Sequence, residues 1–345
     1  MLYAKSLSRD AERIKRYLSR MDVIDNHNDV LHSGSYVYFP VNISDARIKK
    51  LIEKSGTGIV KLDRPANRKP SNYQELLKEK LGVAEMKELT VGFDLFGSIA
   101  LIDVPSGLEK KEGIIAHAIM MANPRIKTVL AKAGPISGVF RTRKMRFVAG
   151  EKNFIALHKE NGCMFRFDVR KVFFSGRFAF ERTRITQLVS PRERVMVMFA
   201  GVGPFAIEIA KAQKKSKVVA IELNRYGYKY MLDNIKLNKT DNVTPVLGDV
   251  RTAVNHFKGF ADRIIMPMPK SSDTFLDEAL LAARKKAIVH IYTFAPVENQ
   301  FERIKSEIVQ HAKANGYKVR FISGRVVRPY SAKEAEVVLD YAIIK

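Results

Sequence analysis

Residues 195–222 read VMVMFAGVGPFAIEIAKAQKKSKVVAIE, and this stretch decides the fold of the C-terminal half. An apolar run, VMVMFA, leads into a glycine-containing turn, a helical stretch and a second apolar run that ends at Glu222. Short apolar runs that flank a helix are typical of a right-handed βαβ unit, in which the two strands are parallel. The stretch therefore predicts the beginning of an α/β sheet.

The same alternation continues toward the C-terminus. Strand-like runs recur at 242–249, 263–268 and 287–294, with helical stretches between them. The tail has two more strand-like runs, at 319–329 and 336–345, with no helical stretch between them. We therefore expect an α/β, Rossmann-like sheet that is mostly parallel, with helices on both faces and two final antiparallel strands.

The N-terminal half has a different pattern, which predicts two smaller α+β domains. Helical and strand-like stretches fill the first 60 residues, and residues 62–74 are rich in proline, asparagine and charge, as in a linker. The stretch that follows ends in a hairpin that turns at Asn161-Gly162. The predicted domains are 1–66, 71–169 (an RNA-binding domain) and 170–345.

The chain is strongly basic. Lysine and arginine number 60 against 36 aspartates and glutamates, which gives a net charge of +24. The excess is positive in every part of the chain, as expected for a protein that binds a polyanion and releases its counterions. The alternative is a solvated surface that serves only solubility.

Neither metal binding nor secretion is indicated. Cys163 is the only cysteine, and the seven histidines show no metal-ligand spacing, so we expect no metal site. The N-terminus lacks the apolar core of a signal peptide, and no apolar run approaches the roughly 20 residues that span a bilayer. We expect a cytoplasmic monomer without membrane contact.

The glycine turn and two acidic residues predict a nucleotide site. Gly201 and Gly203 lie between the first strand and its helix, Glu222 ends the second strand and Asp249 ends the third. Acids at the carboxyl ends of neighbouring parallel strands can hold ribose hydroxyls, although glycine at such a turn is often only structural and the acids are often helix caps. The absence of a full GxGxxG and of GxxxxGK[ST] favours a nucleoside-type cofactor and argues against phosphoryl transfer.

Six segments also occur in the order of a known family: GVFRTRKMRFVAGE, DVRKVFFSGRFAFERTRI, MFAGVGPFAIEIA, AIELNRYGYKYMLDNIKLNK, VLGDVR and IIMPMPKSSDTFLDEAL. Over roughly 71–345, the chain resembles the archaeal and eukaryotic tRNA (guanine-37, N1) methyltransferases. The small N-terminal domain also fits that family, in which it contacts the outer corner of tRNA. The resemblance implies a class I methyltransferase with S-adenosylmethionine as cofactor and tRNA with guanine at position 37 as partner.

The resemblance also implies roles for individual residues. Glu181 matches the general base that removes the guanine N1 proton, and Arg143 the arginine that orients the base and stabilises charge on O6. The residues expected at the cofactor are Phe173, Arg177, Phe199, Gly201, Gly203, Glu222, Leu223, Asp249 and Pro267, with Arg177 at the methionine carboxylate. Those expected to contact RNA are Arg141, Lys144, Arg146 and Lys270.

Simpler readings remain for both catalytic candidates. Glu181 could pair with Arg182 or Arg184 on a helix, and Arg143 could make a generic phosphate contact.

Three departures from the family pattern leave other functions open. Pro267 stands where an asparagine is usual, Val197 where an aspartate is common, and Phe178 to Phe180 replaces small residues. The alternatives are a wyosine-pathway relative, which transfers an aminocarboxypropyl group or methylates a tricyclic guanine at position 37, and a diverged tRNA-binding protein without activity.

Overall fold

The computed structural model describes the chain except for residues 26–29, 44, 63–71, 90–91 and 136. Most of the predicted linker at 62–74 thus lies outside the described residues. Contacts divide the chain into two compact units, which are described separately: 1–89 with 105–125, and 90–104 with 126–345. The three domain boundaries given above remain predictions.

The first unit begins with a four-stranded antiparallel sheet in the order β2-β3-β1-β4. Its strands are β1 (Leu2–Leu7), β2 (Leu31–Ser33), β3 (Tyr36–Pro40) and β4 (Gly58–Lys61). Helices α1 (Ala11–Arg20) and α2 (Ala46–Lys54) bury Ile14, Leu18 and Ile52 in one core with strand residues such as Phe39. These elements confirm the α+β pattern expected for this segment.

Three further helices complete the first unit: α3 (Tyr73–Leu77), α4 (Val83–Glu88) and α5 (Glu112–Ala122). The side chain of Asn72 accepts a hydrogen bond from the Glu75 N–H and so caps the start of α3. α3 ends at Leu77, and Gly82 is the N-cap of the separate helix α4.

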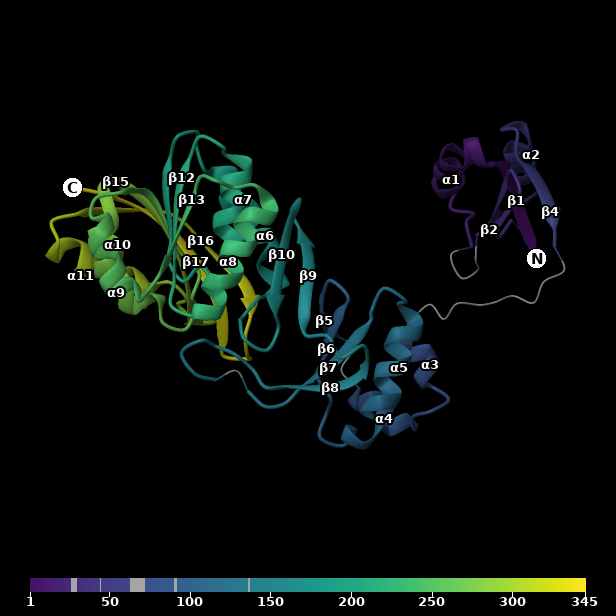
Figure 1. The fold of residues 1–345 in the computed structure, drawn as a ribbon, viewed down its shortest axis with the longest axis horizontal. Coiled ribbons are helices and arrows are strands. Elements are labelled where there is room, and N and C mark those ends of the chain that lie inside the picture. Colours follow the sequence, from purple (N-terminus) through teal and green to yellow (C-terminus); the bar gives the residue numbers. More distant parts are fainter. Residues whose placement is uncertain (26–29, 44, 63–71, 90–91, 136) are drawn as a thin grey trace. The chain divides into compact units, whose positions relative to one another are not determined.

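The second unit contains a seven-stranded sheet in the order β13-β12-β11-β14-β15-β17-β16 (Figure 1). The strands are β11 (Arg194–Val197), β12 (Lys217–Glu222), β13 (Val243–Leu247), β14 (Ala261–Met266), β15 (Ala283–Pro296), β16 (Lys318–Pro329) and β17 (Glu334–Ile344). The first five strands are parallel, and β17 pairs antiparallel with both β15 and β16. The predicted topology is confirmed.

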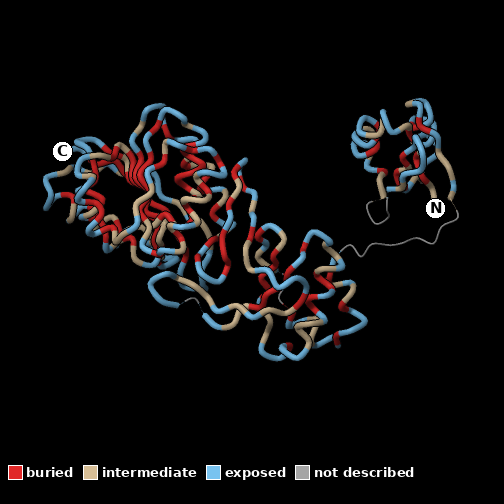
Figure 2. Tube along the Cα trace, viewed as in Figure 1, coloured by how far each residue is buried: buried red, intermediate tan, exposed pale blue. Residues whose placement is uncertain are grey.

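Helices cover both faces of this sheet, because every strand buries side chains on alternate sides. Met196 and Ile264 face a core with α9 (Val250–Ala253), α10 (Leu276–Ala282) and α11 (Glu302–Ala314). Val195 and Ile265 face the other core, with α6 (Ala179–Leu188), α7 (Pro204–Ala212) and α8 (Arg225–Asn238). Figure 2 shows the buried central strands between the more exposed helices.

Two strand lengths differ from the expectation. β11 ends at Val197 instead of continuing to residue 200, because Phe199 and Gly201 take positive φ angles of 57° and 60° and turn the chain. β15 is longer than the predicted 287–294. Its charged first part pairs with β14 and β17, and its last residues pair with β17.

The second unit also holds a smaller four-stranded sheet and a hairpin. The sheet has the order β5-β6-β7-β8, from β5 (Phe93–Phe96), β6 (Ile99–Ile102), β7 (Thr128–Lys132) and β8 (Met145–Gly150). The hairpin joins β9 (Ile155–Glu160) to β10 (Cys163–Asp168) and turns at Asn161-Gly162, as predicted. Asn234 and Asn238 of α8 bond the backbone of β10 and hold the hairpin on the helix. Within the described ranges, every helix is too short or too polar to cross a membrane.

Candidate active site

The turn after β11 brings backbone to the edge of a cavity. Gly203, with a φ of 89°, begins α7, and Pro204 is the first helical residue. A Cβ at Gly203 would lie 3.0 Å from side-chain atoms of both Ile207 and Met231, so glycine is required there for packing. Gly201 lines the cavity, whereas Gly203 lies behind it.

Glu222 ties the glycine turn to the next helix. Its Oε2 accepts a hydrogen bond from the Gly201 N–H and its Oε1 one from the Asn224 N–H, each at 2.6 Å. Burial raises the pKa of Glu222, and these backbone bonds oppose that effect. A carboxylate has about four acceptor positions, so the backbone donors, which include Leu223, leave acceptor capacity for a ligand on the cavity side.

Asp249 both caps a helix and faces the cavity. Its Oδ1 accepts a hydrogen bond of 2.8 Å from the Arg251 N–H at the start of α9. The guanidinium of Arg251 lies 3.8 Å from Oδ2 and sits over the ring of Phe275, 3.9 Å from its centroid. The two interpretations considered for this acid, helix cap and ligand contact, are therefore compatible.

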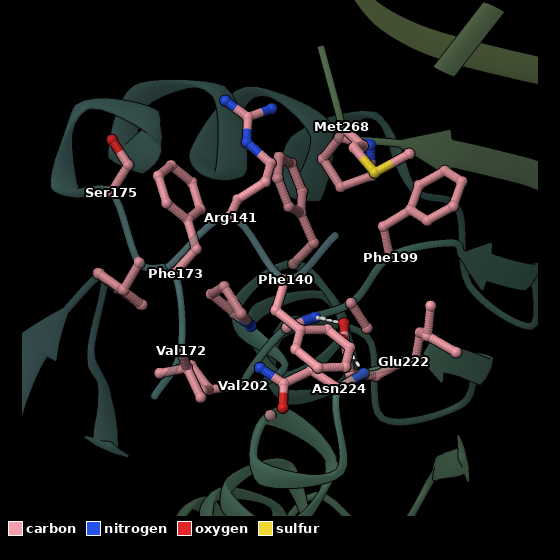
Figure 3. A pocket seen from close by; sticks show the side chains of 18 of the residues that line it. Phe140, Arg141, Val172, Phe173, Ser175, Phe199, Val202, Glu222, Asn224 and Met268 are labelled. Carbon is pink, nitrogen blue, oxygen red and sulfur yellow. Dashed lines mark hydrogen bonds between the residues drawn. The ribbon is translucent and has the colours of Figure 1, made fainter. Parts of the chain in front are cut away.

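The cavity has a volume of about 220 Å³, and its walls are largely aromatic and aliphatic (Figure 3). Seven of the predicted cofactor residues line it: Phe173, Phe199, Gly201, Glu222, Leu223, Asp249 and Pro267. Phe140, Asn224, Met268 and Phe275 also line it and were not singled out from the sequence. The sequence carries a signal for Asn224, because an asparagine directly before a helical stretch is a common helix cap. Asn224 indeed caps α8 and donates to the Lys171 carbonyl.

A second hollow, of about 820 Å³, lies between the small sheet and the carboxyl end of the large one, and we call it the basic groove. Its cationic lining residues are Lys132, Arg141, Arg143, Arg177, Lys270, Arg303 and Arg328. Fewer acids accompany them: Asp94, Asp103, Asp273 and Glu334. A surface of this kind suits a phosphate backbone.

The groove holds several residues expected elsewhere. Arg177 lies on the short helix Gly176–Phe178, 3.6 Å from Asp94, and does not line the cavity, where the cofactor carboxylate was expected. Arg143 lies 4.0 Å from Asp103, also outside the cavity lining.

The four residues expected to contact RNA fall into two groups. Arg141 lines both the cavity and the groove and stacks near Phe173, 5.3 Å from its ring centroid, whereas Lys270 lines the groove alone. Lys144 and Arg146 are exposed next to and on β8 and line neither hollow.

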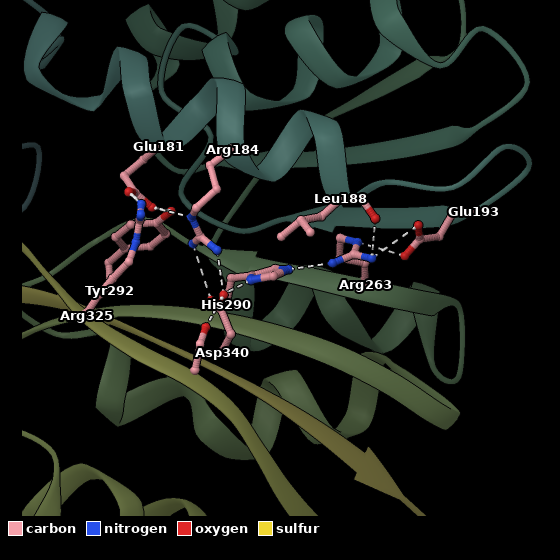
Figure 4. A network of polar contacts seen from close by, with 10 residues as sticks. Glu181, Arg184, Leu188, Glu193, Arg263, His290, Tyr292, Arg325 and Asp340 are labelled. Carbon is pink, nitrogen blue, oxygen red and sulfur yellow. Dashed lines mark hydrogen bonds and ion pairs between the residues drawn. The ribbon is translucent and has the colours of Figure 1, made fainter.

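Glu181 lies in a buried polar network and does not line the cavity (Figure 4). Its side chain is 3% exposed, and its Oε2 accepts hydrogen bonds from the Tyr292 hydroxyl at 2.8 Å and from Arg184 Nε at 3.0 Å. Oε1 forms an ion pair with Arg325. The pairing with Arg184 considered from the sequence is present, but it is buried and not on a helix surface.

The same network continues away from Glu181. Asp340 accepts hydrogen bonds from Arg184 and from His290, at 2.5 and 2.7 Å. Burial would raise the pKa of Asp340, but these two partners hold it below its usual range. His290 Nε2 accepts from Arg263, so its Nδ1 carries the proton given to Asp340, and burial lowers the pKa of this neutral imidazole.

Comparison with known proteins agrees with this architecture. The family model described as the TRM5/TYW2 methyltransferase domain matches residues 156–320. Models described as the TYW2 N-terminal domain and the tRNA methyltransferase 5 N-terminal domain match 73–153 and 8–52.

Individual relatives extend these matches. The tRNA (guanine(37)-N(1))-methyltransferase Trm5b of Pyrococcus abyssi is 32% identical over 97% of both chains. The solved complex of aTrm5 with tRNALeu has a TM-score of 0.71 and 27% identity and covers 100% of both chains. The solved complex of Methanocaldococcus jannaschii TYW2 with AdoMet has a TM-score of 0.60 and 27% identity and covers 74% of this chain and all of that one.

These likenesses confirm the Rossmann-like methyltransferase fold expected from the sequence. The identity extends along nearly the whole chain, and the three family models match successive segments of it. This protein therefore belongs to the TRM5/TYW2 family of methyltransferases.

Proposed function

We propose that this protein transfers a methyl group from S-adenosylmethionine to N1 of guanine 37 in tRNA. The observation that carries the proposal is one cavity that combines the glycine turn, Glu222 and Asp249 and that adjoins the basic groove. The relative with 32% identity bears the same activity in its name, which supports the proposal. One chain supplies both the cavity and the groove, so we propose that it acts as a monomer.

The residues of the cavity fit S-adenosylmethionine. The free lone pairs of Glu222 can accept the two ribose hydroxyls, and Asp249, which only accepts hydrogen bonds, suits an adenine amino group. Phe199 and Phe275, whose ring centroids lie 4.8 Å apart, offer apolar surface for a purine. When bound, the cofactor supplies a methyl group made electrophilic by a sulfonium.

The transfer needs a proton acceptor as well as a methyl donor. The bond from guanine N1 to the methyl carbon forms as the carbon–sulfur bond breaks, the electron pair goes to sulfur, and the N1 proton passes to a base. Glu181 is our candidate for that base. To accept the N1 proton, its carboxylate must give up its contact with Arg325 or Tyr292 and contact the purine instead. Arg143 is our candidate for stabilising charge on O6, since a guanidinium stays charged and donates in a planar fork.

The basic groove supports binding of tRNA next to the cavity. Guanine 37 must leave its loop stack to enter a hollow of this size, which costs a few kcal/mol that phosphate contacts and stacking can offset. The exposed aromatic face of Phe173, beside Arg141, offers a surface for stacking at the point where the cavity meets the groove.

Mass spectrometry of nucleoside 37 tests the proposal directly. The purified protein is incubated with S-adenosylmethionine whose methyl group carries isotopic label and with tRNA that has guanine at position 37. We expect labelled 1-methylguanosine at that position, and none in a matched tRNA with adenine there. An added aminocarboxypropyl group, or an unmodified guanine, would refute the proposal.

One observation favours a second candidate, the modification of a tricyclic guanine derivative at position 37. The cavity wall formed by Pro267, Met268 and Pro269 has no side-chain amide, so it suits a larger apolar ring better than a polar purine edge. The same mass-spectrometric assay, with tRNA that carries the tricyclic base, separates this candidate from the first.

A further inference from the structure

Glu336 of β17 is a buried carboxylate that lines the cavity, and the roles described so far do not use it. Its side chain is 0% exposed, and its Oε2 accepts a hydrogen bond from Nε of Arg328, its cross-strand neighbour on β16. Its Oε1 is buried and has no hydrogen-bond partner among the described residues. One acceptor in the cavity wall is therefore unused.

The unused oxygen has a free-energy cost. A buried acceptor without a partner destabilises the fold, and more so when it is charged. Arg328 and the nearby positive charge of Arg141 offset part of that cost, but neither donates to Oε1. By contrast, both oxygens of Glu181 have protein partners. Glu336 is thus a glutamate of the cavity wall that, like Glu222, has acceptor capacity left for a ligand.

The chemistry of a carboxylate limits what that ligand can be. An ionised carboxylate only accepts hydrogen bonds, so the ligand must present N–H or O–H donors. Guanine is the base whose Watson–Crick edge carries two adjacent donors, the N1–H and the exocyclic N2 amino group, whereas adenine places an acceptor at N1. Pro267, which also lines the cavity, cannot supply that acceptor from its side chain, because it has no polar side-chain atom.

We propose that Oε1 of Glu336 accepts a hydrogen bond from the N2 amino group of the target guanine and thereby selects guanine over other bases. This inference rests on the proposed function, since it takes guanine as the substrate base. In this role Glu336 determines specificity, and the removal of the N1 proton is left to another group. Glu336 then supplies a polar contact to the base that the side chain of Pro267 cannot make.

Inosine provides the test, because it is guanine without the N2 amino group and keeps the N1–H. Two tRNAs that differ only in guanine or inosine at position 37 are bound to the protein in the presence of S-adenosylhomocysteine, and their Kd values are compared. We expect the wild-type protein to prefer guanine by about 10- to 100-fold, as for a site whose buried polar group loses its partner. In Glu336→Ala the preference should fall to about 2-fold or less.

The ratio of kcat/KM for the two tRNAs provides a second readout. The binding ratio remains measurable if no methyl transfer occurs, so failure of the proposed function and failure of this inference give different results. Glu298→Ala, an exposed glutamate in the turn after β15, is the matched control and should keep the wild-type ratio. If Glu336→Ala does not fold, Glu336→Gln keeps the shape of the side chain and should retain only part of the preference.

Three results would overturn the inference. Equal affinity of the wild-type protein for both tRNAs, or an unchanged preference in the variant that folds, would remove Glu336 from base recognition. A loss of S-adenosylmethionine affinity of 10-fold or more in Glu336→Ala, measured by calorimetry, would assign the free oxygen to the ammonium group of the cofactor instead.

Discussion

Two polar regions of the large sheet, the cavity and the network around Glu181, both contain buried carboxylates but differ in how these carboxylates are hydrogen-bonded. In the network, the carboxylates of Glu181 and Asp340 are both paired with arginine, tyrosine or histidine. In the cavity, Glu222 and Glu336 bond protein groups on one side and keep acceptor capacity for a ligand. A buried carboxylate can therefore accept from a ligand directly only where its protein partners leave acceptor capacity, and Glu181 must give up a partner before it can act as the base.

The largest expected effect comes from breaking the network. Asp340→Ala leaves Arg184 and His290 buried without their common acceptor, which should lower the free energy of unfolding by about 3–5 kcal/mol. Urea unfolding followed by circular dichroism measures the change.

Asp340→Asn is the control for that experiment, because it keeps one acceptor and the shape of the side chain. It should cost clearly less than the alanine variant. A loss below about 1 kcal/mol for Asp340→Ala would mean that the network does not stabilise the fold.

A loss of ligand binding, with less change in stability, is expected from the cavity. Glu222→Gln removes the charge and one acceptor, so affinity for S-adenosylmethionine should fall by roughly 100-fold, as expected for two hydrogen bonds to a charged group. Isothermal titration calorimetry provides the dissociation constants.

Asp249→Asn sharpens this result, because asparagine caps a helix as well as aspartate does and only the negative charge is lost. We expect about a 10-fold loss of affinity. If Glu222→Gln bound the cofactor as tightly as the wild-type protein, the cavity would not be the cofactor site.

Local sequence patterns predicted the elements of the sheet and the glycine turn, but not the partners of distant side chains. Gly201, Glu222 and Asp249 were found because strand ends and turns are set by nearby residues. The sequence pattern could not predict that Glu181 bonds Tyr292, 111 positions away, or that Arg184 bonds Asp340, 156 positions away. Such contacts depend on how β15 and β17 pack against α6.

Arg177 and Glu336 illustrate the same limit. The motif around Arg177 matched the family, yet the turn of its short helix directs it to the groove and to Asp94. Glu336 lies in a tail strand with no motif of its own, and only the pairing of β17 with β15 and β16 brings it to the cavity. The role of each site residue remains a prediction for mutagenesis.

A third pair of buried carboxylates predicts that the stability of the fold depends on pH. Glu160 and Glu208 share Arg182: Glu160 accepts hydrogen bonds from its Nε and from one of its terminal nitrogens, whereas Glu208 lies 3.5 Å from Nε. Burial raises the pKa of Glu208 to about 8 from a usual 4.5, so the folded protein keeps its proton where the unfolded chain has lost it. Stability should therefore fall as the pH rises from about 5 to 8 and change no further above that.

Glu208→Gln removes this titration and isolates its effect. The decrease in the free energy of unfolding between pH 5 and 8 should be smaller in the variant than in the wild-type protein, by about 1.4 kcal/mol for each unit by which the pKa of Glu208 is raised. Differential scanning calorimetry at several pH values measures it, and the subtraction cancels the contributions of groups that are common to both proteins. Parallel profiles for the two proteins would contradict the assignment.

The smallest effect is expected in the basic groove, where exposed charges act through a screened field. Lys270→Ala should weaken tRNA binding by roughly 2- to 5-fold and reduce the slope of log K against log salt by about 1, because one fewer counterion is released. Lys215→Ala, an exposed lysine outside both hollows, should leave the slope unchanged. If both variants shifted the slope equally, the net charge of +24 would act as a diffuse field, and the groove would hold no special place in RNA binding.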